Sequence, residues 1–263
     1  MRYLLTNDDG IHAKGLSVLY EELSKDADCL IVAPEVEQSA VGHAITIFRP
    51  LMVRRAAKNG RFLGYAVAGT PADCVKIGIK ELSDGPVDLV VSGINRGANV
   101  GVNVLYSGTV SAATEGIILG IPSLAVSLDT HKDADFSFAA RFARKMAAFM
   151  VENLPFNGTT LNVNVPALPE NEIKGIAVTR QGRARLMENF DKRTDPRDNI
   201  YYWLAGETEF SAEEDQDSDA CALKRGMITI TPLHYDLTRH DVLRDLSSKV
   251  KKHFKKSILS HPM

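Results

Sequence analysis

The sequence contains no apolar run of the ~18 residues that a membrane-spanning helix needs. It also lacks a large excess of charge, because 31 lysines and arginines stand against 33 aspartates and glutamates, for a net charge of −2. The first absence argues against a membrane protein. The second argues against DNA binding, or membrane-surface binding, through a strongly basic face.

Cysteine is scarce, with three residues that lie far apart and show no zinc-type spacing: Cys29, Cys74 and Cys221. An odd number of separated cysteines does not suggest a disulfide framework, so we interpret them as reduced thiols. The N-terminus shows no basic segment followed by an apolar leader. We therefore expect a cytoplasmic protein.

The glycine-rich fingerprint of dinucleotide-binding folds is missing after the first expected strand. Apolar residues predict a strand at 2–6, a helix at 13–25 and a second strand at 29–33. This order is a βαβ unit, and successive units of this kind build a parallel, doubly wound sheet. Because Asn-Asp-Asp-Gly at 7–10 stands where the glycine fingerprint would be, NAD and FAD are not expected ligands.

The remaining elements complete an α/β fold. Strands are expected at 87–92, 123–127, 161–166, 173–180 and 227–233, a β-hairpin at 45–55 and 61–67, and helices at 71–82, 112–119 and 136–153. We expect a Rossmann-like, doubly wound, mostly parallel sheet with added β-hairpins. Thr70 is an expected N-cap with Asp73 in the first helical turn, which gives Asp73 a structural role.

Residues 1–180 should form a Rossmann-like α/β core, and residues 181–263 an irregular arm, a strand and a C-terminal helix within the same structural domain. From residue 181 onward periodicity is weak, so Tyr201–Trp203 are expected in an irregular excursion and the acid-rich stretch 207–219 in a solvated loop. The tail predicts an amphipathic helix that packs on its own subunit or on a partner. Its apolar positions are Leu246, Val250, Phe254 and Ile258.

Two adjacent carboxylates, Asp8 and Asp9, follow the first strand. Carboxylates this close repel each other, and a hard divalent cation with oxygen ligands resolves the conflict. The alternative is a polar turn in which Gly10 supplies a positive φ. Ser39 follows the second strand at the same edge of the sheet; it could add a hydroxyl oxygen, or belong to a plain polar loop.

A loop rich in glycine and asparagine follows the strand that ends at Ser92. Glycine recurs at 93, 97 and 101, and asparagine at 95, 99 and 103. Glycine lets the backbone approach a ligand closely, and asparagine supplies amide donors and acceptors, so we expect a small charged ligand here. Ser107, Gly108 and Thr109 then stand at a helix N-terminus, which favours phosphate binding; a simple N-cap is the alternative.

Together these motifs resemble the SurE family, survival protein E, over nearly the whole chain. The matching segments occur in the family's order: 7–10, Ser39, 69–75, 92–95, Gly97, Asn99, Gly101, 106–109, 115–116, 120–122, 195–197, 202–203 and 231–233. Two departures stand out. Ala40 replaces the glycine often found after the family's ligand serine and should stiffen that loop, and the segment 217–219 matches the family's pattern loosely.

The resemblance implies a metal-dependent phosphatase that hydrolyses nucleoside 5′- and 3′-monophosphates. It implies one divalent cation per subunit, Mg²⁺ or Mn²⁺, and a homodimer or homotetramer that exchanges C-terminal segments. Residues 1–180 are then the expected catalytic core, and residues 181–263 the expected oligomerisation arm and tail. The implied metal ligands are Asp8, Asp9, Ser39 and Asn95. The expected substrate- and phosphate-binding residues are Asn99, Ser107, Gly108 and Thr109.

Under this interpretation Asp8 or Asp9 would accept the proton of the attacking water. His43 could protonate the leaving oxygen, or it could be an ordinary loop histidine. Two alternatives remain at this level. One is a non-catalytic nucleotide- or metabolite-binding protein. The other is a phosphatase with an aspartyl-phosphate intermediate, which the adjacency of Asp8 and Asp9 disfavours because such enzymes separate their two aspartates by one residue.

Overall fold

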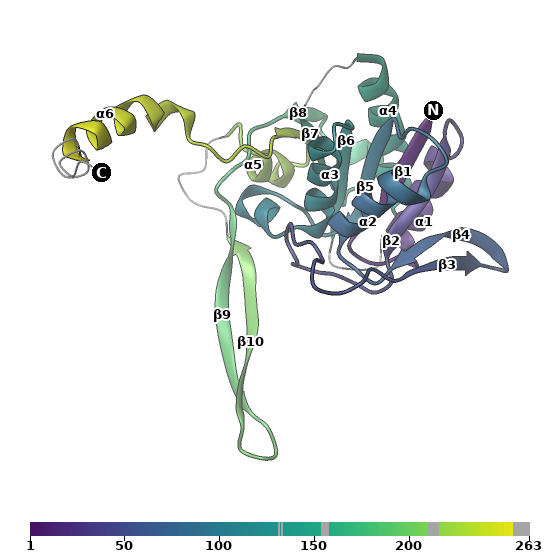
Figure 1. The fold of residues 1–263 in the computed structure, drawn as a ribbon, viewed down its shortest axis with the longest axis horizontal. Coiled ribbons are helices and arrows are strands. Elements are labelled where there is room, and N and C mark those ends of the chain that lie inside the picture. The colour runs from purple at the N-terminus through teal and green to yellow at the C-terminus, as the bar shows by residue number, and fades with distance from the viewer. Residues whose placement is uncertain (131, 133, 154–157, 210–215, 255–263) are drawn as a thin grey trace, which may run out of the picture. The chain divides into compact units, whose positions relative to one another are not determined.

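The computed structural model describes residues 1–130, 132, 134–153, 158–209 and 216–254 (Figure 1). The chain divides into two units, Met1–Leu233 and His234–Met263. The described part of the second unit holds a short 3₁₀ segment, η4 (His240–Val242), and helix α6 (Leu243–Phe254). The expected functional division at residue 180 stays a prediction.

A nine-stranded, mostly parallel sheet forms the centre of the first unit (Figure 1). In spatial order its strands are β3 (Val53–Lys58), β4 (Arg61–Val67), β2 (Asp28–Pro34), β1 (Arg2–Thr6), β5 (Leu89–Arg96), β6 (Ser123–Asp129), β7 (Thr160–Pro166), β11 (Ile228–Leu233) and β8 (Ile176–Val178). Neighbouring strands are parallel except in the pairs β3–β4 and β7–β11. The expected α/β class with a mostly parallel sheet is confirmed.

Helices cover both faces of this sheet. Successive side chains of a strand point to opposite faces, so Leu5 joins the core cluster under α1 (Lys14–Leu23) and α4 (Ser137–Asn153). Leu4 joins the cluster under α2 (Pro71–Ile77) and α3 (Gly108–Ile118). Shorter helical segments connect these layers: η1 (Gly78–Leu82), η2 (Gly101–Leu105), η3 (Glu170–Glu172) and α5 (Asp219–Lys224).

Helix α2 begins with the expected N-cap. The Thr70 hydroxyl accepts the Asp73 N–H at 3.1 Å, and the Asp73 carboxylate accepts the Thr70 N–H at 2.9 Å. This reciprocal capping box satisfies two backbone donors that the helix leaves without intrahelical partners. The structural role assigned to Asp73 is therefore confirmed.

The first expected hairpin strand begins later than its alternating pattern suggested. Strand β3 starts at Val53, and residues 45–52 form an extended loop. The chain at the start of this loop is bonded to the beginning of α2: the Thr46 N–H donates to Asp73, and the Ala44 carbonyl accepts the Thr70 hydroxyl. The alternation of apolar and polar residues at 45–52 therefore predicted a strand wrongly. Backbone groups at the start of this segment bond to the N-terminal residues of α2 instead of to a neighbouring strand.

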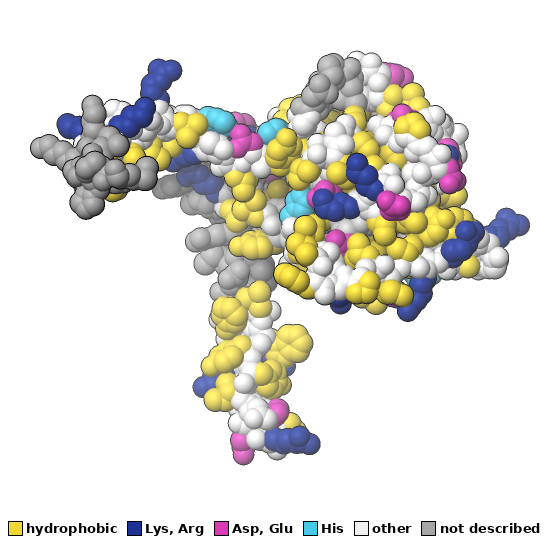
Figure 2. Space-filling model, viewed as in Figure 1, with side chains coloured by type: hydrophobic (Ala, Val, Ile, Leu, Met, Phe, Trp, Pro, Cys, Tyr) yellow, Lys and Arg dark blue, Asp and Glu magenta, His cyan; other side chains and the backbone are white. Residues whose placement is uncertain are grey.

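After residue 181 an irregular excursion was expected, but the chain instead forms a long antiparallel hairpin. Its strands are β9 (Arg185–Thr194) and β10 (Ile200–Glu209), so the expectation is wrong for these residues. Hydrophobic side chains gather along this hairpin in Figure 2. Those at least 41% exposed are Phe190, Ile200, Tyr201, Tyr202, Trp203 and Leu204. Because apolar residues follow one another directly along β10, the alternation of a half-buried strand is missing, and a search for periodicity does not find it.

The acid-rich stretch 207–219 is not uniformly solvated. Residues 210–215 lie outside the described residues, but Asp219 at its end is fully buried and begins α5. The solvated-loop interpretation is therefore wrong for Asp219, because its carboxylate accepts backbone N–H groups inside the first unit.

The expected tail helix is present as α6 within the described residues, and Ile258 lies outside them. Its apolar positions Leu246, Val250 and Phe254 are each about half exposed within this unit, at 44–54%. Among the described residues, no helix combines the length and the apolar character needed to cross a membrane. The expected cytoplasmic location stays a prediction.

The contact between α1 and β5 provides a test of the packing. A Cβ added at Gly15 would lie 2.1 Å from the carbonyl oxygen of Ile94, a backbone atom that cannot move aside alone. We expect Gly15→Ala to lower the free energy of unfolding by roughly 3 kcal/mol, the upper range for overpacking. Urea denaturation checks this. Gly85→Ala is the control, because the nearest atom to its added Cβ belongs to the flexible Arg2 side chain, and equal losses in both variants would contradict the packing argument.

Candidate active site

Strand β1 lies between β2 and β5, so the direction in which the chain adds strands reverses beside it. Ligands of open α/β sheets bind outside the carboxyl ends of the strands at such a switch point. Asp8 and Asp9 follow β1 directly, and Asn95 lies near the carboxyl end of β5. The sheet order therefore brings these three side chains to one edge.

A hollow of about 220 Å³ lies at this edge. It is lined by Asp8, Asp9, Glu37, Ser39, Ala40, Asn95, Arg96, Asn99, Asn103, Tyr106 and Ser107. The lining includes all four residues expected to bind a metal, together with two of the residues expected to bind substrate, Asn99 and Ser107. Residues from four separate chain segments thus meet in one place.

The two aspartates are crowded in a poorly solvated position. Burial raises the pKa of Asp8, partly offset by the hydrogen bond from Thr109. Burial, and then the negative charges of Asp8 and Glu37, raise the pKa of Asp9 to about 6 against the opposing charge of Arg96. The negative charge at this edge is therefore incompletely compensated by the protein's own cations.

The start of α3 holds Asp8 in place. The buried Thr109 hydroxyl donates a hydrogen bond to the Asp8 carboxylate. Gly108 lies so close that an added Cβ would be 2.7 Å from the Asp8 Cβ and 2.9 Å from its Oδ2. Glycine is therefore required at position 108, because any larger side chain would displace Asp8.

The neutral donors are also oriented by local contacts. The Asn95 side-chain nitrogen donates to the Gly97 carbonyl at 2.8 Å, which leaves the Asn95 Oδ1 as its available ligand atom. The Ser39 hydroxyl donates to Glu37, and its oxygen keeps lone pairs for a further contact. Ala40 adopts a φ of 55°, a conformation that costs a residue with a Cβ about 1–2 kcal/mol.

This donor set fits a hard divalent cation. Carboxylate, hydroxyl and amide oxygens suit Mg²⁺ and Mn²⁺. Within the described part of the chain, no group of three or more His, Cys, Asp and Glu side chains is arranged to hold a metal. A cation at this edge would therefore depend on the neutral oxygens of Ser39 and Asn95 as well as on the two carboxylates.

The three residues expected to bind phosphate have different positions. Ser107 lines the hollow and is also the N-cap of α3, because its hydroxyl accepts the Val110 N–H at 3.1 Å. Gly108 and Thr109 contact Asp8 and are not part of the lining. The N-terminus of α3 still faces this edge of the sheet with its positive dipole end.

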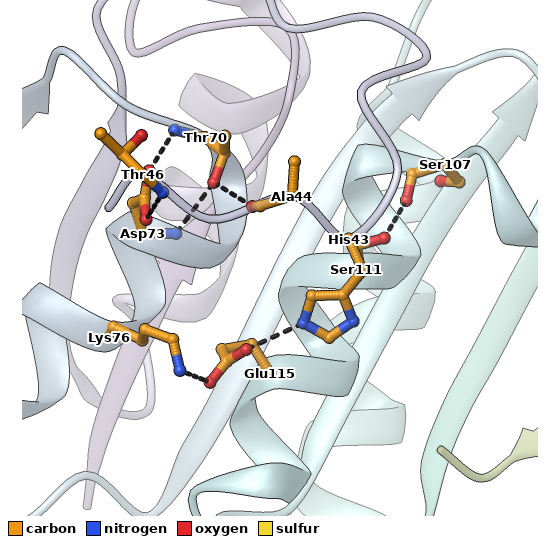
Figure 3. A network of polar contacts seen from close by, with 9 residues as sticks. All are labelled: His43, Ala44, Thr46, Thr70, Asp73, Lys76, Ser107, Ser111 and Glu115. Carbon is orange, nitrogen blue, oxygen red and sulfur yellow. Dashed lines mark hydrogen bonds and ion pairs between the residues drawn. The ribbon is translucent and has the colours of Figure 1, made fainter. Parts of the chain in front are cut away.

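His43 is not among the residues that line the hollow. Its Nε2 lies 2.8 Å from the carboxylate of Glu115 on α3, which also pairs with Lys76 of α2 (Figure 3). Burial alone would raise the pKa of Glu115, but the hydrogen bonds from His43 and Lys76 outweigh it and hold the pKa below its ordinary value. With the two bonds from the 44–46 segment to α2, this contact fastens the loop that carries Ser39.

Four lining residues were not assigned a site role from the sequence, although Asn103 was noted as one of the loop's recurring asparagines: Glu37, Arg96, Asn103 and Tyr106. Their sequence neighbours provided a signal, because Glu37 is two residues from Ser39 and the other three lie in or beside the glycine–asparagine loop. Asn162 and Asn164 on β7 were also missed, although two asparagines in a fully buried strand are unusual. Both donate to the Asn99 carbonyl, at 2.8 and 3.1 Å.

The strand order and the oxygen-lined hollow define a doubly wound α/β protein with a ligand site at its switch point. The family model described as "Survival protein SurE" matches residues 3–188. The chain therefore belongs to the SurE family, as its motifs indicated.

Individual relatives agree with this assignment. The chain is 69% identical over 252 residues, 96% of this chain and 95% of the relative, to a protein of Syntrophus aciditrophicus named 5′-nucleotidase SurE. It is 52% identical over 247 residues, 94% of this chain and 98% of the relative, to the protein of the same name in Syntrophobacter fumaroxidans. The crystal structure of the SurE protein from Aquifex aeolicus matches with a TM-score of 0.82 and 39% identity, covering 95% of this chain and 100% of that one.

The Thr109–Asp8 hydrogen bond generates a prediction for metal binding. Thr109→Val keeps the shape of the side chain but removes the donor, so Asp8 loses its orienting partner. We expect Mn²⁺ affinity to fall by about 10-fold or more, as for other residues that support a ligand. Calorimetric titration with Mn²⁺ measures this. Thr109→Ser retains the hydroxyl and should bind nearly as well as the native chain; equal affinity in the valine variant would contradict the assigned role.

Proposed function

We propose that this protein is a metal-dependent phosphatase that hydrolyses nucleoside 5′- and 3′-monophosphates to nucleosides and inorganic phosphate. One observation carries the proposal: Asp8, Asp9, Ser39 and Asn95 line the same hollow as Ser107 at the N-terminus of α3. Oxygen ligands for a cation and a helix N-terminus suited to phosphate thus lie together at one edge of the sheet. The name 5′-nucleotidase SurE, borne by the two relatives, supports the choice of substrate.

Asp8, Asp9, Ser39 and Asn95 would hold one Mg²⁺ or Mn²⁺, which when bound supplies charge that polarises a phosphoryl group and acidifies a water molecule. Ser107 and the first N–H groups of α3 bind the phosphate oxygens. Asn99 and Arg96, which also line the hollow, contribute further donors. A carboxylate of the Asp8–Asp9 pair accepts the proton of the attacking water.

The proposal assigns His43 to the loop that presents Ser39. Its Nε2 is bonded to Glu115, and the ring is not part of the hollow's lining. Proton donation to the leaving oxygen therefore falls to water in this scheme. Against an aspartyl-phosphate intermediate stands the burial of Asp8, whose carboxylate is already bonded to Thr109.

Phosphate release measures the activity directly. With AMP and other nucleoside monophosphates, we expect turnover with Mn²⁺ or Mg²⁺ and none with EDTA. Asp9→Asn should lower kcat at least ~100-fold, because the cation loses a charged ligand. Asp84→Asn, which alters an exposed carboxylate remote from the hollow, should retain the native rate.

Three results would contradict this proposal in whole or in part. Binding of AMP without release of phosphate from any nucleotide would favour a non-catalytic binding protein. Trapping of radioactive phosphate on the protein during turnover would favour the aspartyl-phosphate mechanism. Native activity in Asp9→Asn would remove the proposed metal ligand set.

We also propose that the protein is a homodimer or homotetramer. A two-stranded hairpin alone is marginally stable in water, yet β9–β10 exposes Tyr202 and Trp203 at 57% and 59%. Exposed aromatics of this size are typical of interfaces. Helix α6 likewise has an apolar stripe that is about half exposed within its own unit. A second copy of the chain would cover both surfaces.

Removal of the tail and disruption of the hairpin test this assembly separately. A chain ended after Leu237, and a full-length Trp203→Ser variant, should each sediment as smaller species than the native protein, because each loses apolar contact area. The loss of one Trp side chain typically costs an interface about 2 kcal/mol or more when it is central. Sedimentation velocity decides the matter, and unchanged assembly in both variants would show that these surfaces are not the interface.

A further inference from the structure

Asp219 is a fully buried carboxylate that the scheme above does not use. Its Oδ2 accepts the N–H of Gly101 at 3.0 Å, and its Oδ1 accepts the N–H groups of Gly182 and Ala220 at 2.9 and 2.8 Å. A buried carboxylate needs several such donors to offset its lost hydration. One side chain therefore connects the glycine–asparagine loop with the segment that leads into the β9–β10 hairpin.

Gly101 is fixed from several directions at this junction. Its carbonyl accepts the Gln181 side-chain N–H at 2.8 Å, and the next residue, Val102, donates its N–H to the Ala184 carbonyl at 2.8 Å. Gly101 has a φ of 58°, and an added Cβ would lie 2.2 Å from the Ala184 oxygen. The loop backbone thus lies directly against the chain at the base of the hairpin.

The other end of the loop is fastened to β7. The Asn99 N–H donates to the Asn164 side chain at 2.7 Å, and the Asn99 carbonyl accepts from both Asn162 and Asn164. The Asn99 side chain in turn donates to Ser127 at 2.9 Å. With Asn99 held by β7 and Gly101 held by Asp219, the loop has two anchors on either side of Val100.

We propose that Asp219 is a positioning residue for substrate binding. It fixes the loop whose residues Asn99 and Asn103 line the hollow, and it ties that loop to the base of the hairpin. None of the four expected metal ligands lies between Gly97 and Asn103. Asp219 therefore positions residues expected to bind the substrate, and not those expected to bind the metal. This inference rests on the proposed function.

The substitution Asp219→Asn tests the role. An amide has one oxygen, so whichever way it is oriented its nitrogen faces a backbone N–H that Asp219 now accepts. Loss of one buried hydrogen bond displaces the loop, and we expect KM for AMP to rise about 10-fold while kcat changes less than about 3-fold. Mn²⁺ affinity, measured by calorimetry, should stay native. Asp217→Asn is the matched control. It removes the same negative charge, but from an exposed carboxylate that pairs with Arg180 and not with the loop.

Gln181→Ala provides a second route if Asp219→Asn does not fold. It removes the donor to the Gly101 carbonyl without burying a new polar group, and KM should rise in the same direction. A purely structural role would lower the denaturation temperature and the active fraction with KM unchanged; that result in the two variants would overturn the proposal. Absence of phosphatase activity in the native protein would instead overturn the proposed function. In that case calorimetric titration with inorganic phosphate in the presence of Mn²⁺ still tests Asp219, and native affinity in Asp219→Asn would overturn its role.

Discussion

The repulsion between two neighbouring carboxylates at the end of β1 is the constraint on which the site depends. Asp8 is buried beside Asp9, and burial raises the pKa of both groups. The surrounding structure holds them in this unfavourable arrangement, through the Thr109 hydroxyl on one side and the close approach of Gly108 on another. Such crowding favours the binding of a cation, because a cation converts the repulsion into affinity.

The sequence was sufficient to predict the core and the edge of the sheet at which the candidate metal ligands meet. Parallel strands alternate with amphipathic helices, so their periodicity is local and easily detected. Once the order of βαβ units is accepted, residues that follow successive strands must meet at one edge. Asp8, Ser39 and Asn95 were placed together for this reason, and the structure gathers them in one hollow.

The missed features depend on contacts between distant parts of the chain. Gly101 and Asp219 are 118 residues apart, and no local pattern distinguishes Asp219 from the exposed Asp217 two residues before it. The β9–β10 hairpin was missed because its exposed side chains lack the alternation of a half-buried strand. The contact of His43 with Glu115 likewise joins a loop to a helix 72 residues away, so its direction could not be inferred from its sequence neighbours.

The residues that line the hollow and the residues that support it come from different parts of the chain, which has a consequence for synthesis on the ribosome. Every residue that lines the hollow lies at or before Ser107, whereas the asparagines of β7 that hold the loop and the anchoring Asp219 follow much later. Domains fold as units while the chain emerges from its N-terminus. A nascent chain therefore carries the groups that line the hollow before it has the β7 asparagines and Asp219 that fix the loop, so the hollow reaches its final form only after most of the chain has been made.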